Sequence, residues 1–103
     1  MGPRMPFDPF VTRSLTVVSI CANAPSASGV YGLTSSREWI YIGQTDDIQA
    51  SLLSHLQQSG SMLMQKKPTG FVFELCTAAG RSARQDRLVF EYEPVCNRML
   101  PSP

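Results

Sequence analysis

Two tyrosines, two glycines and a histidine are spaced so that they could form a polar site. Tyr31 follows Gly29 by two positions, Tyr41 precedes Gly43 by two positions, and nine residues lie between the tyrosines. His55 is the single histidine. Phenol and imidazole groups can exchange hydrogen bonds and protons with a ligand. The alternative is structural: the tyrosines pack across a hairpin, and His55 is a solvated or hydrogen-bonded helix residue.

A period of two predicts the strands that would carry the tyrosines. Trp39, Tyr41 and Gly43 alternate with Ile40 and Ile42, which is typical of a strand over residues 38–44. Residues 29–34 form a second predicted strand, and the short polar segment 34–37 predicts a hairpin turn between them. Trp39 is expected to pack on the sheet rather than to stack on a nucleic-acid base.

A period of three to four predicts the helices. Ile48, Leu52 and Leu56 predict a helix over 47–58, which Thr45, Asp46 or Asp47 could cap. The segment 61–70 is predicted as a connector with a helical turn, 71–77 as a strand and 81–92 as a helix that Pro94 ends.

The N-terminal part is predicted to be an extended arm. Residues 1–13 contain three prolines, and 15–21 are apolar and β-branched, which favours an extra strand or a buried extended segment. The expected organisation is thus an arm over 1–27 and a domain over 28–100. The fold class is α/β in the α+β sense, with a small, mainly antiparallel, three-stranded sheet flanked by helices.

Composition limits the function without naming it. The chain has 103 residues, 43% hydrophobic content and a formal net charge of +1, which indicates one folded domain without a strongly basic field. Cys21, Cys76 and Cys96 form no zinc-ligand spacing and are expected to be reduced thiols. No apolar run is long enough to cross a membrane, and the expected location is cytoplasmic.

In this context the chain resembles the GIY-YIG superfamily of endonucleases over residues 28–98. The first motif stands as Gly29-Val30-Tyr31 and the second as Tyr41-Ile42-Gly43. The closing helix ends in Tyr-x-Pro-x-x-Asn, here Tyr92, Pro94 and Asn97. The ordered set of motifs is more specific than either triplet alone.

The resemblance implies metal-dependent cleavage of a DNA phosphodiester, with Mg²⁺ or Mn²⁺ as the cofactor if the protein is active. Tyr31 and Tyr41 would flank the phosphate and position or deprotonate the water, and His55 would join the same face. An arginine on the helix after the second motif would bind the phosphate, and a glutamate on the later helix would hold the metal.

Both charged positions of that pattern are neutral here. The arginine is expected eight residues after Gly43, which is Ser51, and the glutamate seven residues before Tyr92, which is Gln85. Ser51 and His55 share a helix face, and Gln85 is expected to face the sheet. Gln85 is the candidate metal ligand in the glutamate position, although an amide adds no charge. Asn97 is either a site residue or a helix C-terminal cap.

Basic side chains could bind a nucleic-acid backbone through phosphate contacts; the alternative is a solvated charged face. The candidates are Lys66, Lys67, Arg84 and Arg87, in a basic group with Arg81. The leading interpretation is a catalytically impaired GIY-YIG domain with residual nucleic-acid binding. The alternatives are an active divergent endonuclease and a protein-interaction module. A protein partner could supply specificity, and no membrane partner is expected.

Overall fold

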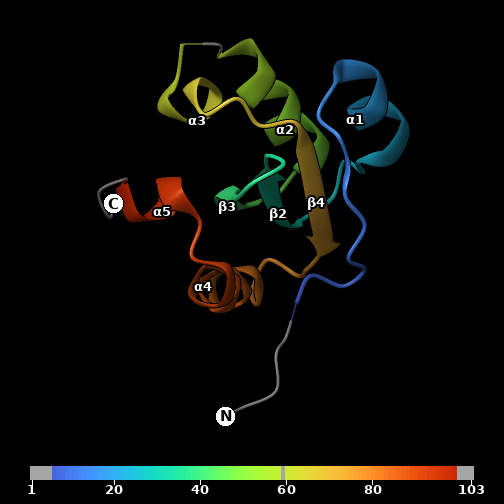
Figure 1. The fold of residues 1–103 in the computed structure, drawn as a ribbon. Helices are drawn as coiled ribbons and strands as arrows, with labels where there is room; N and C mark the ends of the chain where they lie inside the picture. Colours follow the sequence, from blue (N-terminus) through green and yellow to red (C-terminus); the bar gives the residue numbers. More distant parts are fainter. Residues whose placement is uncertain (1–5, 59, 100–103) are drawn as a thin grey trace.

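The computed structural model describes residues 6–58 and 60–99 and shows a four-stranded sheet between two layers of helices (Figure 1). The strands lie in the order β1-β4-β2-β3, and each pair is antiparallel. In chain order the elements are β1 Arg13–Ser14, α1 Val17–Asn23, β2 Gly29–Thr34, β3 Trp39–Thr45, α2 Ile48–Gln57, α3 Met62–Gln65, β4 Gly70–Leu75, α4 Arg81–Tyr92 and α5 Val95–Met99.

The mainly antiparallel α+β architecture is confirmed, but the sheet has four strands rather than three. Arg13 and Ser14 pair with Phe71 and Gly70 of β4 and add a two-residue edge strand. So short a segment carries no alternation that the sequence could reveal. At the opposite edge, β3 pairs with β2 and is flanked by α4 and α5 (Figure 1).

The extended segment expected over residues 15–21 is wrong, because most of it lies in α1. Thr16 caps the helix, and its hydroxyl accepts a hydrogen bond from the Ser19 amide at 3.1 Å. Ile20 and Ala24, four residues apart, are buried, whereas Val18 is 80% exposed. Burial at a spacing of four outweighs the strand preference of the β-branched residues, since tertiary packing overrides weak local propensity.

The predicted capping of α2 is confirmed at Asp47, whose carboxylate accepts a hydrogen bond from the Ala50 amide at 2.9 Å. This contact fixes where the helix begins and therefore which of its residues face the sheet. Ile48 and Leu52 are fully buried there. Ser51 and His55, four residues apart on α2, lie on the same side of this helix, as the spacing predicts.

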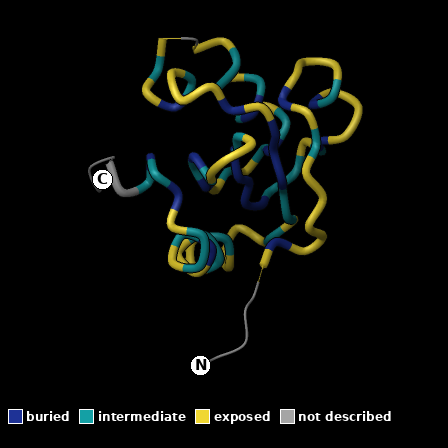
Figure 2. The backbone as a smooth tube through the Cα atoms, viewed as in Figure 1, coloured by how far each residue is buried: buried dark blue, intermediate teal, exposed yellow. Residues whose placement is uncertain are grey.

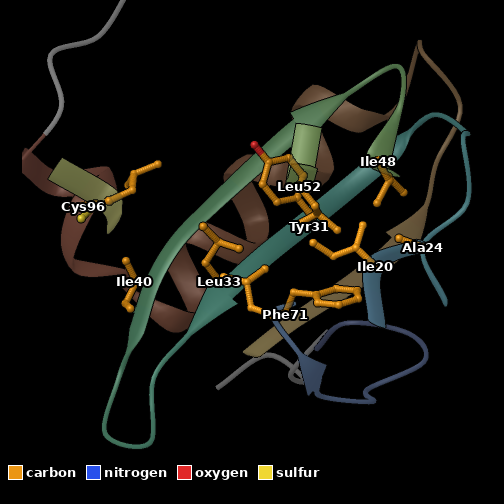
Figure 3. Close-up of a cluster of buried hydrophobic side chains, with 11 residues drawn as sticks. Ile20, Ala24, Tyr31, Leu33, Ile40, Ile48, Leu52, Phe71 and Cys96 are labelled. Carbon is orange, nitrogen blue, oxygen red and sulfur yellow. The ribbon is translucent and has the colours of Figure 1, made fainter. Parts of the chain in front are cut away.

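Each face of the sheet carries its own apolar cluster, and the buried residues lie along the strands and the inner sides of the helices (Figure 2). On the α2 face, Tyr31, Leu33 and Phe71 pack against Ile20 and Leu52 (Figure 3). On the α4 face the buried residues are Phe7, Val30, Ile42, Val72 and Leu88. No helix within the described ranges is long and apolar enough to cross a membrane.

The described part of the N-terminal arm is packed through Phe7, which is 2% exposed. Its ring lies parallel to the ring of Trp39, with the centroids 5.6 Å apart. The Trp39 and Tyr92 ring centroids lie 4.2 Å apart. Trp39 therefore packs on the sheet as expected. The division of the chain at residue 27 stays a prediction, and residues 1–5 of the predicted arm lie outside the described residues.

We expect Phe7→Ala to lower the free energy of unfolding by about 3–5 kcal/mol, because the substitution leaves a cavity in the α4-side cluster. The control is Phe10→Ala, since Phe10 also contacts Trp39 but is 53% exposed. It should cost about 1 kcal/mol or less. Urea unfolding would measure both, and equal losses would contradict the anchoring role of Phe7.

Candidate active site

Three aromatic side chains converge on the α2 face of the sheet. Tyr31 comes from β2, Tyr41 from β3 and His55 from α2, and their ring centroids lie 5.6 to 6.1 Å apart. The hydroxyl of Tyr31 lies 2.8 Å from Nε2 of His55, a hydrogen-bond distance. The structure therefore brings together the residues that the sequence predicts as a site.

Steric crowding explains why glycine occupies both motif positions. Tyr31 lies opposite Gly43 in the β2–β3 pair, and a Cβ at Gly43 would lie 2.7 Å from the Tyr31 hydroxyl oxygen. The ring thus occupies the space of the missing side chain. A Cβ at Gly29 would overlap the Glu74 carbonyl of the neighbouring strand and crowd Ile48. Gly29 excludes a larger residue because the neighbouring backbone approaches closely, and Gly43 excludes one because the rings of Tyr31 and Tyr41 fill the space.

Burial favours the neutral form of all three groups. It raises the pKa of Tyr31 far above the ordinary tyrosine value, and the nearby Tyr41 phenol raises it further. Burial also raises the pKa of Tyr41 and lowers the pKa of His55. In each case a low-dielectric surrounding disfavours the charged form. The cluster can thus exchange hydrogen bonds with a ligand but carries no charge for it.

Ser51, in the position where the resemblance expects an arginine, is held by a local hydrogen bond. Its hydroxyl donates to Oγ1 of Thr45 at 2.6 Å, and the Thr45 hydroxyl donates to the Asp47 carbonyl at 3.2 Å. These contacts tie the end of β3 to the first turns of α2. No guanidinium comes from this helix, since α2 contains no arginine.

Gln85, in the expected glutamate position, faces the sheet as predicted and is engaged at both ends of its amide. Its Nε2 donates to the Ile42 carbonyl at 3.1 Å, and its Oε1 accepts from Nε2 of Gln44 at 3.1 Å. The carbonyl oxygen that a metal would require thus accepts one hydrogen bond, from Gln44. Gln85 acts here as a tie between α4 and the edge strand β3.

Asn97 holds the backbone of the same residue, Ile42, from α5. Its Oδ1 accepts from the Ile42 amide at 2.7 Å, and its Nδ2 donates to the Ile42 carbonyl at 2.9 Å. The side-chain amide thereby pairs with the free side of the edge strand as a neighbouring strand would. Of the two open interpretations, the helix cap does not describe this contact, because the partner lies on β3.

Arg84 lies on the other face of the sheet, away from the tyrosines. Its guanidinium pairs with the Glu74 carboxylate at 2.7 Å and donates to the Pro6 carbonyl at 2.7 Å. Burial opposes ionisation of Glu74, but hydrogen bonds from Arg84 and from the Asp8 amide outweigh it, and the pKa of Glu74 lies below its usual range. Arg84 is thus already paired with a carboxylate.

The other predicted basic residues are exposed: Lys66 and Lys67 after α3, and Arg87 on α4. Their role in nucleic-acid binding stays a prediction. Sequence reasoning assigned no separate role to Arg81, whose guanidinium donates to Oε1 of Gln44 at 3.2 Å and to Oγ of Ser28 at 3.0 Å. The available signal was its position four residues before Gln85, on the same face of α4.

Gln85 and its partner Gln44 offer a divalent cation amide oxygens but no carboxylate. A hard cation such as Mg²⁺ prefers several oxygen ligands with at least one carboxylate. Among residues 6–58 and 60–99, no three histidine, cysteine, aspartate or glutamate side chains are grouped so that they could hold a metal. Gln85 supplies an oxygen that is already hydrogen-bonded to Gln44.

We expect Gln85→Glu to destabilise the protein at neutral pH. A carboxylate would place a second acceptor against the Ile42 carbonyl, which Gln85 now reaches with a donor at 3.1 Å. The loss should be about 1–3 kcal/mol and should shrink at acidic pH, where a protonated carboxyl can donate. Gln57→Glu on the exposed end of α2 is the control and should cost under about 1 kcal/mol. Denaturant unfolding that found equal costs would contradict the tie.

The pH dependence of stability should carry the signature of His55. Because burial lowers its pKa, the unfolded chain binds a proton more readily than the folded chain. The free energy of unfolding should be fully retained above the ordinary histidine pKa of about 6.5 and should fall as the pH drops toward the folded value.

The histidine ring signal in an NMR titration is unambiguous, since the chain has one histidine. Its midpoint should be lower in the folded protein than in urea, and His55→Gln should remove the part of the stability loss that begins just below neutral pH. Coincident midpoints in the two states would show that His55 is not desolvated.

Comparison with known proteins identifies the fold. The chain is similar to the GIY-YIG N-terminal endonuclease domain of UvrC from Thermotoga maritima bound to magnesium, with a TM-score of 0.61 and 20% identity, covering 70% of this chain and 84% of that one. Two point mutants of that domain, bound to the divalent cation, match over the same share of this chain with TM-scores of 0.61 and 0.60. No protein-family model and no curated protein matches significantly. The motifs, the sheet and this likeness together show that the chain has a GIY-YIG-like nuclease fold.

Proposed function

We propose that this domain binds the phosphate backbone of a nucleic acid, in the first place DNA, without cleaving it. The observation that carries the proposal is the amide of Gln85, which joins Ile42 and Gln44 where a metal-binding carboxylate is expected. The structural neighbour is an endonuclease domain bound to magnesium, and this supports a phosphodiester as the ligand class.

The proposed loss of cleavage has a charge argument. Hydrolysis of a phosphodiester builds negative charge in the transition state, and enzymes stabilise it with fixed cations and metal ions. Tyr31, Tyr41 and His55 offer neutral hydrogen-bonding groups, and Ser51 supplies no cation. Removal of one transition-state donor commonly costs about 10²–10³ in rate, and here both charged partners are replaced.

The proposed binding uses what the site retains. Tyr41 and His55 are half-buried, so part of each side chain borders solvent. Neutral donors and nearby cations position a phosphate without reading the bases. Specificity would then come from a protein partner or from the arm. The described cysteines are free thiols, which supports the cytoplasm as the proposed location.

The direct test is nicking of a supercoiled plasmid with Mg²⁺ or Mn²⁺. We expect wild type to nick no faster than Tyr31→Phe, and the double variant Ser51→Arg with Gln85→Glu to show metal-dependent nicking, because it returns the phosphate-binding cation and the metal-binding carboxylate. A melting curve of each variant checks that it is folded. Metal-dependent nicking by wild type that disappears in Tyr31→Phe would instead establish an active divergent endonuclease with Mg²⁺ or Mn²⁺ as its cofactor.

The binding part is tested by fluorescence anisotropy with a labelled duplex oligonucleotide. Affinity should fall with rising salt, because phosphate contacts release condensed counterions. Absence of binding at low salt would overturn the nucleic-acid role and leave a protein-interaction module as the remaining function of this fold.

A further inference from the structure

A cation lies close to the position where the resemblance expects a metal-binding acid. We propose that Arg81 binds the phosphodiester directly and supplies the positive charge that Ser51 does not. This inference rests on the proposed function and names the residue that would carry it. Arg81 comes from α4, on the opposite side of the edge strand from the helix that bears Ser51 (Figure 1).

The guanidinium of Arg81 is held in place but not neutralised. Its two acceptors, Oε1 of Gln44 and Oγ of Ser28, are uncharged. An arginine has five N–H donors, so two hydrogen bonds leave others available for a ligand. Arg84, three residues later, differs because the Glu74 carboxylate pairs with it. In the described part of the chain no carboxylate pairs with Arg81.

Arg81 is also connected to both motifs. Gln44 directly follows Gly43, and Ser28 directly precedes Gly29, so the guanidinium bridges the end of β3 and the beginning of β2. The Gln44 amide continues to Gln85, which ties it to the Ile42 carbonyl. This chain of hydrogen bonds holds the guanidinium beside the ends of β2 and β3, which favours binding because less side-chain freedom remains to be lost.

The electrostatics of the place favour an anion over a metal ion. A guanidinium repels a divalent cation and pairs with phosphate oxygens in a bidentate geometry. The acidic residues that follow β3 in the sequence are Asp46 and Asp47. The Asp47 carboxylate accepts from the Ala50 amide, and the first turn of α4 carries no acidic residue. The ligand class is therefore a phosphodiester bound without a bridging metal.

The test compares Arg81→Gln with Arg37→Gln in the same anisotropy assay, in the presence of EDTA. Both remove one positive charge, but Arg37 is exposed at the turn between β2 and β3. Arg81→Gln should weaken binding roughly tenfold at low salt and lower the slope of log affinity against log salt by about one. Arg37→Gln should change the affinity by less than about twofold and leave the slope unchanged. Arg81→Lys keeps the charge and should recover part of the affinity.

Labelled DNA and RNA oligonucleotides of the same sequence distinguish the two sources of phosphodiester. Arg81→Gln should lose affinity for the nucleic acid that the wild-type protein binds. Equal effects of Arg81→Gln and Arg37→Gln would overturn the role of Arg81 while leaving nucleic-acid binding intact. No binding by wild type to either oligonucleotide would overturn the proposed function and this inference together. Unaltered melting temperatures would show that an affinity loss is not a loss of fold.

Discussion

The backbone amide and carbonyl of Ile42 are the groups on which the edge of the fold and the site both depend. Ile42 lies on β3, the edge strand, where an amide and a carbonyl would otherwise be left without a partner. Asn97 pairs with both groups, and Gln85 adds a second donor to the carbonyl. One residue of the strand thus receives side chains from α4 and α5. Because Tyr41 and Gly43 are its direct neighbours, these contacts also fix the site.

This arrangement explains why a glutamine can replace an acid without loss of architecture. A carboxylate at position 85 would be free to bind a cation but could not donate to the Ile42 carbonyl unless it were protonated. The amide does donate, and its oxygen accepts from Gln44. On the proposed function, this position supplies a structural hydrogen bond in place of a metal ligand. Buried or half-buried polar groups are costly when unpaired, so this exchange favours stability over metal affinity.

Much of the site could be predicted because two regular periods place its residues. The alternation in 38–44 puts Tyr41 and Gly43 on one face, and the spacing of four on α2 puts His55 beside Ser51. The same reasoning predicts that Gln85 faces the sheet. What could not be predicted depends on contacts between distant segments. No local sequence signal predicts three of these contacts. They are the pairing of Arg13 with Phe71, the burial of Ile20 and the ion pair between Arg84 and Glu74.

On the proposed function, the neutral residues at the two expected charged positions are coupled rather than independent losses. An arginine on α2 and a glutamate on α4 serve a metal-bound phosphate together, and neither has the same use once the other is absent. With Gln85 neutral, the cation that remains near the strand ends is Arg81, held by Gln44 and Ser28. A guanidinium there pairs with a phosphate but activates no water, since it offers hydrogen-bond donors and no acceptor. Binding without cleavage is what such a redistribution of charge would produce.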